Sequence, residues 1–166
     1  MYTLRAKVTV EDLPKMKVYS DAEQGIEDPR NKALGCRLIT EEALEEGVFA
    51  EYEKLRISLG VADSFDFTPD KSFIQQYRAD ESNAINYKKG CYVGQEVIAR
   101  THYKGTVRKT LFITEGDLPG FGDEILSDGK KIGTMLSSAE NIGLALCDIE
   151  AAKSASGLNF TLTAIA

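Results

Sequence analysis

The chain has 166 residues, of which 43% are hydrophobic and 28% are charged, so it can fold around one core or two small ones. The composition is not that of a disordered chain, and no run approaches the roughly 18 consecutive apolar residues of a membrane-spanning helix. The net charge of −6 disfavours long-range attraction to nucleic acid.

Short extended segments are predicted near the N-terminus. Apolar and polar residues alternate from Leu4 to Val10, which is the period of a half-buried strand and not the continuous apolar run of a secretory signal. Residues 15–20 and 34–39 favour two further extended segments. A turn is expected between them at Asp28-Pro29-Arg30, because the residue before a proline is pushed away from helical dihedral angles.

A helix is expected from Glu41 onward. Thr40 is a suitable N-cap, and Gly60 is a suitable C-terminal stop. The prediction rests on an apolar stripe at helical spacing, formed by Leu44, Val48, Tyr52, Leu55 and Leu59.

The following segment, 63–83, is polar, contains a proline and predicts a long excursion that wraps the domain. Residues 84–87 favour a short strand, and residues 95–102 a short helix.

From residue 107 the pattern becomes all-β. The Asp128-Gly129 pair is typical of a tight hairpin. Strands are expected at 107–113, 132–137, 142–147 and 160–165, which together predict a small antiparallel barrel. A boundary near residue 106 divides the chain into segments 1–105 and 106–166.

The clearest chemical signal is the segment Lys88-Lys89-Gly90-Cys91-Tyr92-Val93-Gly94-Gln95-Glu96. Neighbouring ammonium groups and a helix N-terminus both favour a thiolate. The glycines allow a sharp bend or the close approach of a ligand. A cysteine taken alone is more often a small buried hydrophobe. The neighbours of Cys91 instead predict a reactive thiolate that faces a cavity.

No bound metal is expected. Cys36, Cys91 and Cys147 are widely spaced and His102 is the only histidine, so the paired ligands of a zinc site and the four thiolates of a protein-held cluster are missing. The odd number of cysteines argues against a disulfide framework and predicts a reducing, cytoplasmic location. A Cys91–His102 pair is open, but a structural role is the simpler interpretation of His102.

Positive charge gathers between Lys88 and Lys109, where six basic residues accompany one acidic residue, Glu96. This window carries +5, which leaves −11 for the rest of the chain because the total is −6. Such a patch can attract an anionic small molecule, although solvated surface charges explain it equally well.

Polar residues around the cysteine have two interpretations each. Gln95 and Glu96 could hydrogen-bond a heterocycle edge, although an acidic residue in the first turn of a helix needs no function. Arg100 could bind a ligand carboxylate or pair with Glu96 four residues earlier. Arg56 departs from the apolar stripe, and most such arginines are solvated.

The segment from Lys89 to Glu96, with Arg100 following, resembles the K-G-C-[YF]-x-G-Q-E-x-x-x-R motif of the YgfZ-type folate-binding proteins. These are relatives of the glycine-cleavage T-protein, an aminomethyltransferase, and they support iron–sulfur protein maturation. The similarity spans essentially the whole chain and includes Tyr2-x-Leu4-Arg5-x-Lys7-Val8, Asp28-Pro29-Arg30, Leu34-Gly35-x-Arg37, Tyr52-x-x-x-Arg56, Gly122-Asp123-x-Ile125 and Ile132-Gly133.

This resemblance implies an α+β protein. Residues 1–105 would be a partial T-protein-like (split ferredoxin-like) folate-binding domain, and residues 106–166 a small C-terminal antiparallel β-barrel. It implies tetrahydrofolate as the ligand and Cys91 as the reactive residue. The implied cofactor-binding residues are Arg56, Lys88, Lys89, Tyr92, Gln95, Glu96 and Arg100.

One departure concerns the N-terminus. Family members carry a substantial portion before the Tyr2-x-Leu4-Arg5 strand, and in true T-proteins that portion contains the catalytic aspartate. Its absence leaves open whether the chain is an enzyme. It also predicts a separate N-terminal polypeptide or self-association, because the missing half would leave an edge exposed.

The leading hypothesis is therefore a folate-binding accessory protein for iron–sulfur cluster assembly or repair that works with client or assembly proteins and not with a membrane. A tetrahydrofolate-dependent one-carbon transferase is the second hypothesis. The third is an RNA-binding or tRNA-modification accessory protein that uses the basic, tyrosine-containing window.

Overall fold

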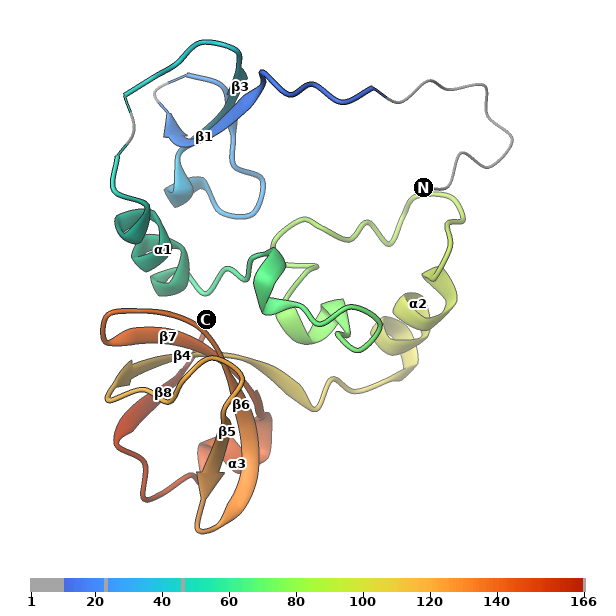
Figure 1. Cartoon of the computed structure of the whole chain (residues 1–166). Coiled ribbons are helices and arrows are strands. Elements are labelled where there is room, and N and C mark those ends of the chain that lie inside the picture. Colours follow the sequence, from blue (N-terminus) through green and yellow to red (C-terminus); the bar gives the residue numbers. More distant parts are fainter. Residues whose placement is uncertain (1–10, 23, 46, 166) are drawn as a thin grey trace.

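A computed structural model gives the structure of the chain and describes residues 11–22, 24–45 and 47–165. The first described elements are strands β1 (Lys17–Ala22), β2 (Ile26–Glu27) and β3 (Cys36–Thr40), which form a small antiparallel sheet in the order β1-β3-β2 (Figure 1). The extended segments predicted at 15–20 and 34–39 are confirmed. The strand predicted at 4–10 lies outside the described residues.

Helix α1 runs over Phe49–Ser58, so the prediction of a helix from Glu41 is wrong at its start. Thr40 is the last residue of β3, and Val48 occupies the N-cap without a side-chain hydrogen bond. The glycine at position 47 disfavours a helix just where the predicted one would have continued. The predicted stripe is also wrong, because the buried residues of α1 are Glu53, Arg56 and Ile57.

The chain also forms three short 3-10 helices: η1 (Lys32–Leu34) lies between β2 and β3, while η2 (Ser64–Asp66) and η3 (Ile74–Tyr77) lie between α1 and the second α-helix. Helix α2 spans Gln95–Lys104 and confirms the helix predicted there. The strand predicted at 84–87 is wrong: these residues are coil and turn. A strand needs a neighbouring ladder, and Tyr87 instead stacks on His102 of α2.

The C-terminal part is a five-stranded antiparallel sheet in the order β5-β6-β7-β4-β8. Its elements are β4 (Lys109–Gly116), β5 (Glu124–Ser127), β6 (Lys130–Ala139), β7 (Ile142–Asp148), α3 (Ile149–Lys153) and β8 (Phe160–Ala164). The predicted strands and the Asp128-Gly129 hairpin are confirmed. Both hairpin residues have the positive φ that this two-residue turn requires.

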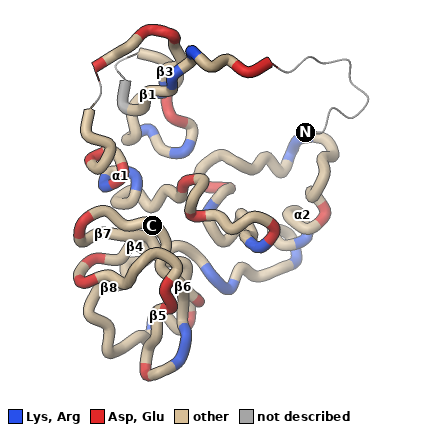
Figure 2. Tube along the Cα trace, in the orientation of Figure 1, with Lys and Arg blue, Asp and Glu red and all other residues tan. Residues whose placement is uncertain are grey.

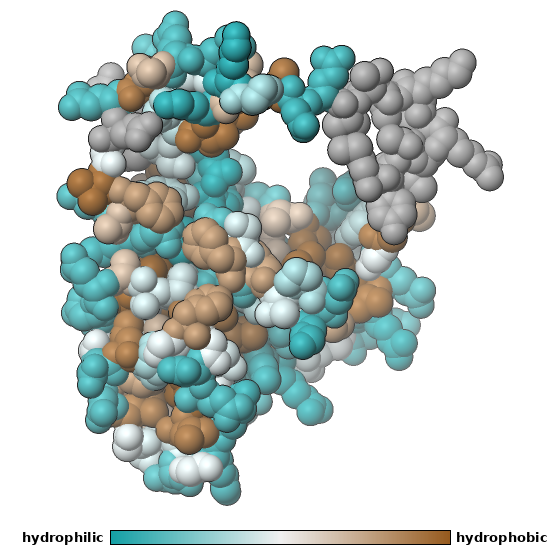
Figure 3. Space-filling model, viewed as in Figure 1, coloured by the Kyte–Doolittle hydropathy of each residue, from teal (hydrophilic) through white to brown (hydrophobic). Residues whose placement is uncertain are grey.

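Two hydrophobic clusters form the core. One lies inside the sheet around Phe112, Ile125, Met135 and Cys147. The other joins Ile57 of α1 and Tyr77 of η3 to Leu111, Leu136 and Leu144 of the sheet. On the face of the molecule seen in Figure 3, hydrophobic residues are interspersed with hydrophilic ones.

The chain is thus a mixed α/β protein with a barrel-like C-terminal sheet. The T-protein-like architecture of residues 1–105 stays a prediction. None of the described helices has the length and apolar character needed to cross a bilayer.

Candidate functional site

Cys91 lies in an exposed loop immediately before α2. Gly94 is the N-cap of the helix with φ 88°, a conformation that favours glycine. The loop is closed by two hydrogen bonds. The Tyr92 N–H donates to Gln95 Oε1 at 3.2 Å, and the Gln95 N–H donates to the Tyr92 carbonyl at 3.2 Å. Gln95 therefore stabilises the turn that presents the cysteine.

The expectation that Cys91 faces a cavity is not met, since the residue lines neither described pocket and its side chain is open to solvent. The physical reason is that no element among residues 11–22, 24–45 and 47–165 covers this loop, and α2 itself has no fully buried residue. Cys147 is the opposite case. It is fully buried in the sheet, and burial raises the pKa of its thiol to about 12. Cys36 is intermediate in exposure.

The charged neighbours of Cys91 are also exposed. The Lys89 ammonium lies 4.4 Å from the centroid of the Tyr92 ring, a cation–π contact. Lys88, Glu96 and Arg100 point to solvent, and no ion pair joins Glu96 to Arg100 in the described part of the chain. The structure therefore brings the predicted residues 88–100 onto one exposed segment.

Helix α2 is held to the rest of the molecule by few contacts. Gln75 Nε2 donates to the Ile98 carbonyl at 2.8 Å, and the Tyr87 ring stacks on His102 with centroids 3.7 Å apart. The Gln75 Oε1 atom is buried and has no hydrogen-bond partner. His102 thus has a stacking role, and no described contact joins it to Cys91.

Arg56 is separate from this segment and is fully buried. All five of its N–H groups are engaged by the Glu53 carboxylate, the Val61 carbonyl, the Asp66 carboxylate and the Ser137 hydroxyl. Burial alone would lower the pKa of Arg56, but its hydrogen bonds with Glu53 and the charges of Asp66 and Glu53 raise it. This corrects the interpretation of Arg56 as solvated or as a folate ligand, because no donor is left for a ligand.

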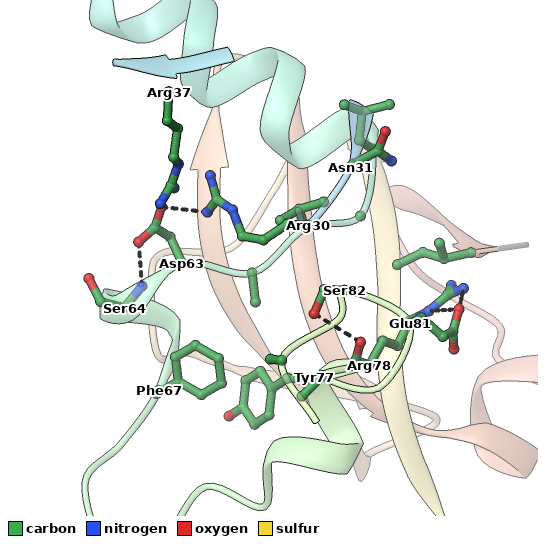
Figure 4. A pocket seen from close by; sticks show the side chains of 17 residues that line it. Arg30, Asn31, Arg37, Asp63, Ser64, Phe67, Tyr77, Arg78, Glu81 and Ser82 are labelled. Atoms are coloured by element: carbon green, nitrogen blue, oxygen red, sulfur yellow. Dashed lines mark hydrogen bonds and ion pairs between the residues drawn. The ribbon is translucent and has the colours of Figure 1, made fainter. Parts of the chain in front are cut away.

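The larger pocket has a volume of about 540 Å³ and lies beside the C-terminal end of α1 (Figure 4). Phe67 and Tyr77 form an aromatic pair in it, with ring centroids 4.6 Å apart. Asp63 accepts hydrogen bonds from Arg30 Nη1 at 3.3 Å and from the Ser64 N–H, as Figure 4 shows.

None of the residues predicted to bind folate lines this pocket. Arg56 is buried in α1, and the others lie on the loop before α2 and on α2, so within the described residues they do not enclose a group as large as a pteridine. No chemical step through folate is therefore derived from them. In the same ranges, no three residues of the types His, Cys, Asp and Glu lie close enough to hold a metal ion.

Comparisons with known proteins bear on the barrel and on the whole chain. Residues 104–165 match the family described as CAF17, C-terminal beta-barrel domain. The chain is 31% identical over 188 residues to "Iron-sulfur cluster assembly factor IBA57, mitochondrial" of Mus musculus, an alignment that covers 92% of this chain and 52% of the relative. The chain is similar to IBA57-type iron–sulfur cluster assembly factors.

Other IBA57 relatives give the same result. The human protein is 30% identical over 181 residues, with 88% of this chain and 51% of the relative covered. The homologue of the fungus Mycosarcoma maydis is 39% identical over 93 residues, or 51% of this chain and 23% of the relative. The chain thus spans about half the length of its mouse and human IBA57 relatives.

The similarity to IBA57 corrects one expectation. The predicted cytoplasmic location is wrong, because these relatives are named as mitochondrial proteins and point to mitochondria. The number of cysteines indicates a reducing environment but does not tell one reducing compartment from another. The resemblance to YgfZ-type proteins is confirmed for the assembly-factor relatives and for the C-terminal barrel, and folate binding stays a prediction.

Sequence reasoning missed a charged cluster beside β2 and β3. Asp28 is 1% exposed and accepts hydrogen bonds from Arg30 and Arg37. Burial raises the pKa of Asp28, but the hydrogen bonds and charges of the two arginines lower it overall. The signal in the sequence is the pair of opposite charges on either side of the proline in Asp28-Pro29-Arg30, a segment from which we predicted a turn and no ion pair.

Proposed function

We propose that this chain takes part in iron–sulfur cluster assembly and that Cys91 is the residue through which it engages a cluster. The observation that carries the proposal is the exposure of Cys91 in the glycine-flanked loop before α2. The names of the IBA57 relatives support the general role. A thiol in this position can reach a metal centre held by another protein, which a buried cysteine cannot do.

In the proposed role the cluster is the cargo and belongs to a partner protein. The Cys91 thiol would lose its proton to solvent, and the thiolate sulfur would replace one ligand of an iron ion, either a water molecule or a partner side chain that is released. Lys88 and Lys89, which precede Cys91 in the same loop, are exposed and add positive charge to the segment that would meet the partner. Gly94 and Gln95 hold the loop in the shape that presents the sulfur. The partners are iron–sulfur assembly or client proteins.

The test uses a strain that lacks its own IBA57 relative and expresses this chain. If the wild-type chain restores the activity of iron–sulfur enzymes, Cys91→Ser is expected to lose that rescue. Cys36→Ser is the matched control, because Cys36 is a half-buried cysteine in β3 and outside the proposed site. Full rescue by Cys91→Ser at equal protein level would refute the proposed role of the thiol.

Tetrahydrofolate stays a separate proposal for the Cys91 segment. The exposed Lys88 and Lys89 would attract the glutamate tail of folate, and the Tyr92 ring would contact its aromatic part. Titration of tetrahydrofolate against the chain, with Lys88→Ala/Lys89→Ala as the variant, tests this proposal. Binding that is unchanged in that variant would place folate elsewhere.

A further inference from the structure

The basic residues between 88 and 109 differ in their pairing from most of the other basic residues that the structure describes. All six are exposed, and within the described residues none forms an ion pair: Lys88, Lys89, Arg100, Lys104, Arg108 and Lys109. By contrast, eight basic residues elsewhere pair with a carboxylate: Arg30, Lys32, Arg37, Lys54, Arg56, Arg78, Lys131 and Lys153.

These basic residues without ion pairs belong to one contiguous segment of the chain. They follow the loop before α2, the helix itself and the segment that enters β4, as the blue positions in Figure 2 show. Glu96 is the only acidic residue among them. We call residues 88–109 the α2 surface.

The α2 surface also exposes apolar side chains. Val93 is 90% exposed, Val97 is 51% exposed and Tyr103 is 67% exposed. No residue of α2 is fully buried, and only Gln95, Ile98, Ala99 and Thr101 of the helix are half-buried. Exposed apolar side chains among basic residues without ion pairs are the composition of an interface, where apolar contacts exclude water and charged residues set charge complementarity.

We propose that the α2 surface is the docking site for an acidic face of a partner protein, with Val93 and Val97 at the centre of the contact. The proposal rests on the proposed function, since the partner would be the protein that carries the cluster to Cys91. Charge complementarity identifies the chemistry of the partner: the segment carries +5, and its basic residues form no ion pair with a described carboxylate. Docking here would bring a cluster beside the exposed sulfur.

A protein partner fits better than RNA for two physical reasons. The rest of the chain carries −11, which repels a polyanion with one charge on every nucleotide. In addition, the exposed side chains of Val93 and Val97 would be buried favourably against an apolar patch of a protein. A phosphate backbone offers them no such apolar contact.

The experiment measures binding of the full chain to a plant-type [2Fe–2S] ferredoxin, used as a probe because it is an acidic cluster-bearing protein, by calorimetry at low and at physiological ionic strength. The test variant is Lys104→Glu/Arg108→Glu, whose positions are outside the Cys91 loop. The matched control is Lys71→Glu/Lys130→Glu, which makes the same change of net charge at exposed residues without ion pairs. Val97→Asp is a second test variant, and a single-stranded RNA oligonucleotide is the rival probe.

We expect binding that weakens with salt, an affinity about tenfold lower or more in Lys104→Glu/Arg108→Glu, and a similar loss in Val97→Asp. The control should bind like the wild type. Cys36→Ser should also bind like the wild type, because Cys36 lies in β3 and outside the α2 surface. Loss of ferredoxin binding in Lys104→Glu/Arg108→Glu and loss of rescue in Cys91→Ser are separate results, since the double variant keeps the thiol and is judged by binding alone.

Four outcomes overturn the docking proposal. These are no binding to the ferredoxin, an equal loss of affinity in the test and control double variants, RNA binding that outcompetes the ferredoxin, and self-association of the wild-type chain that Lys104→Glu/Arg108→Glu abolishes. The last would assign the α2 surface to a second copy of the chain.

Discussion

Arg56 of α1 and Ser137 of β6 lie in direct contact, with Arg56 Nη2 donating to the Ser137 Oγ at 2.8 Å. The same guanidinium pairs with Asp66 in η2, whose other carboxylate oxygen accepts the Ser137 N–H at 2.9 Å. A three-residue network thus ties the helix, the connecting turn and the barrel-like sheet together in the buried interior.

Replacing Arg56 with methionine is expected to destabilise the chain by about 3–5 kcal/mol, because the Glu53 and Asp66 carboxylates would stay buried without their cation. Urea unfolding followed by circular dichroism measures the loss. Lys54→Met is the control on the same helix. Its ion pair with Glu140 is half exposed, so a change within about 1 kcal/mol is expected. Equal losses in the two variants would contradict a special role of the buried network.

The buried carboxylate of Asp28 predicts a stability that depends on pH. Its folded-state pKa is lowered from the ordinary value of 3.8, so the unfolded chain binds the proton more tightly. The contribution of this carboxylate is therefore complete above about pH 4 and is lost as the pH falls through the lower folded-state pKa. In urea unfolding, the gap in stability between the wild type and Asp28→Asn should be largest at neutral pH and narrow below pH 3.8.

Asp117→Asn is the control for that experiment, since Asp117 is exposed and forms no ion pair among the described residues. If the difference in unfolding free energy between the wild type and Asp28→Asn did not change with pH, the hydrogen bonds of the Asp28 side chain would stabilise the fold and its charge would not.

Cys91 and Cys147 should differ in their rates of reaction with iodoacetamide. Cys91 is expected to be alkylated in the native chain because it is exposed. Cys147 is expected to react only after unfolding, since it is inaccessible and a pKa raised from 9.0 to about 12 lowers its thiolate fraction about 1000-fold. Peptide mass spectrometry of samples taken over time, with and without urea, distinguishes the sites. Rapid native labelling of Cys147 would contradict the packing of the sheet.

Gln75→Ala should loosen α2 while changing the global stability little. The variant loses the hydrogen bond from Nε2 to the Ile98 carbonyl but also removes the buried, unpartnered Oε1 atom. Amide exchange in α2 is expected to be about 2- to 10-fold faster, the equivalent of one lost hydrogen bond. Gln76→Ala is the neighbouring control, because no side-chain hydrogen bond of Gln76 is seen in the structure. Unchanged exchange in α2 would mean that the Tyr87–His102 stack holds the helix alone.

Features with local signals were predictable from the sequence. The Asp128-Gly129 hairpin, the alternating strands around it and the helix after Gly94 all have their determinants within a few residues. The exposed surface that carries Cys91 and the basic window was partly predictable too, since the residues are contiguous. Whether that segment faced solvent or a cavity was not, because this depends on what packs over it.

Features that depend on distant partners were not predictable. Arg56 breaks an apolar pattern, which suggests solvent, and its burial depends in part on Asp66, ten positions later, and Ser137, 81 positions later. The Arg30–Asp63 pair joins residues 33 positions apart. The strand expected at 84–87 has suitable residues, but no neighbouring strand is there to pair with them.

The hydrophobic cluster that joins Ile57 and Tyr77 to Leu111, Leu136 and Leu144 has a consequence for the evolution of the sequence as well as for folding. Residues that pack together cannot be substituted independently, since a larger side chain at one position needs a smaller side chain at the position it contacts. The barrel and the segment before it should therefore accumulate compensating substitutions as a single unit, even where a family boundary is drawn between them.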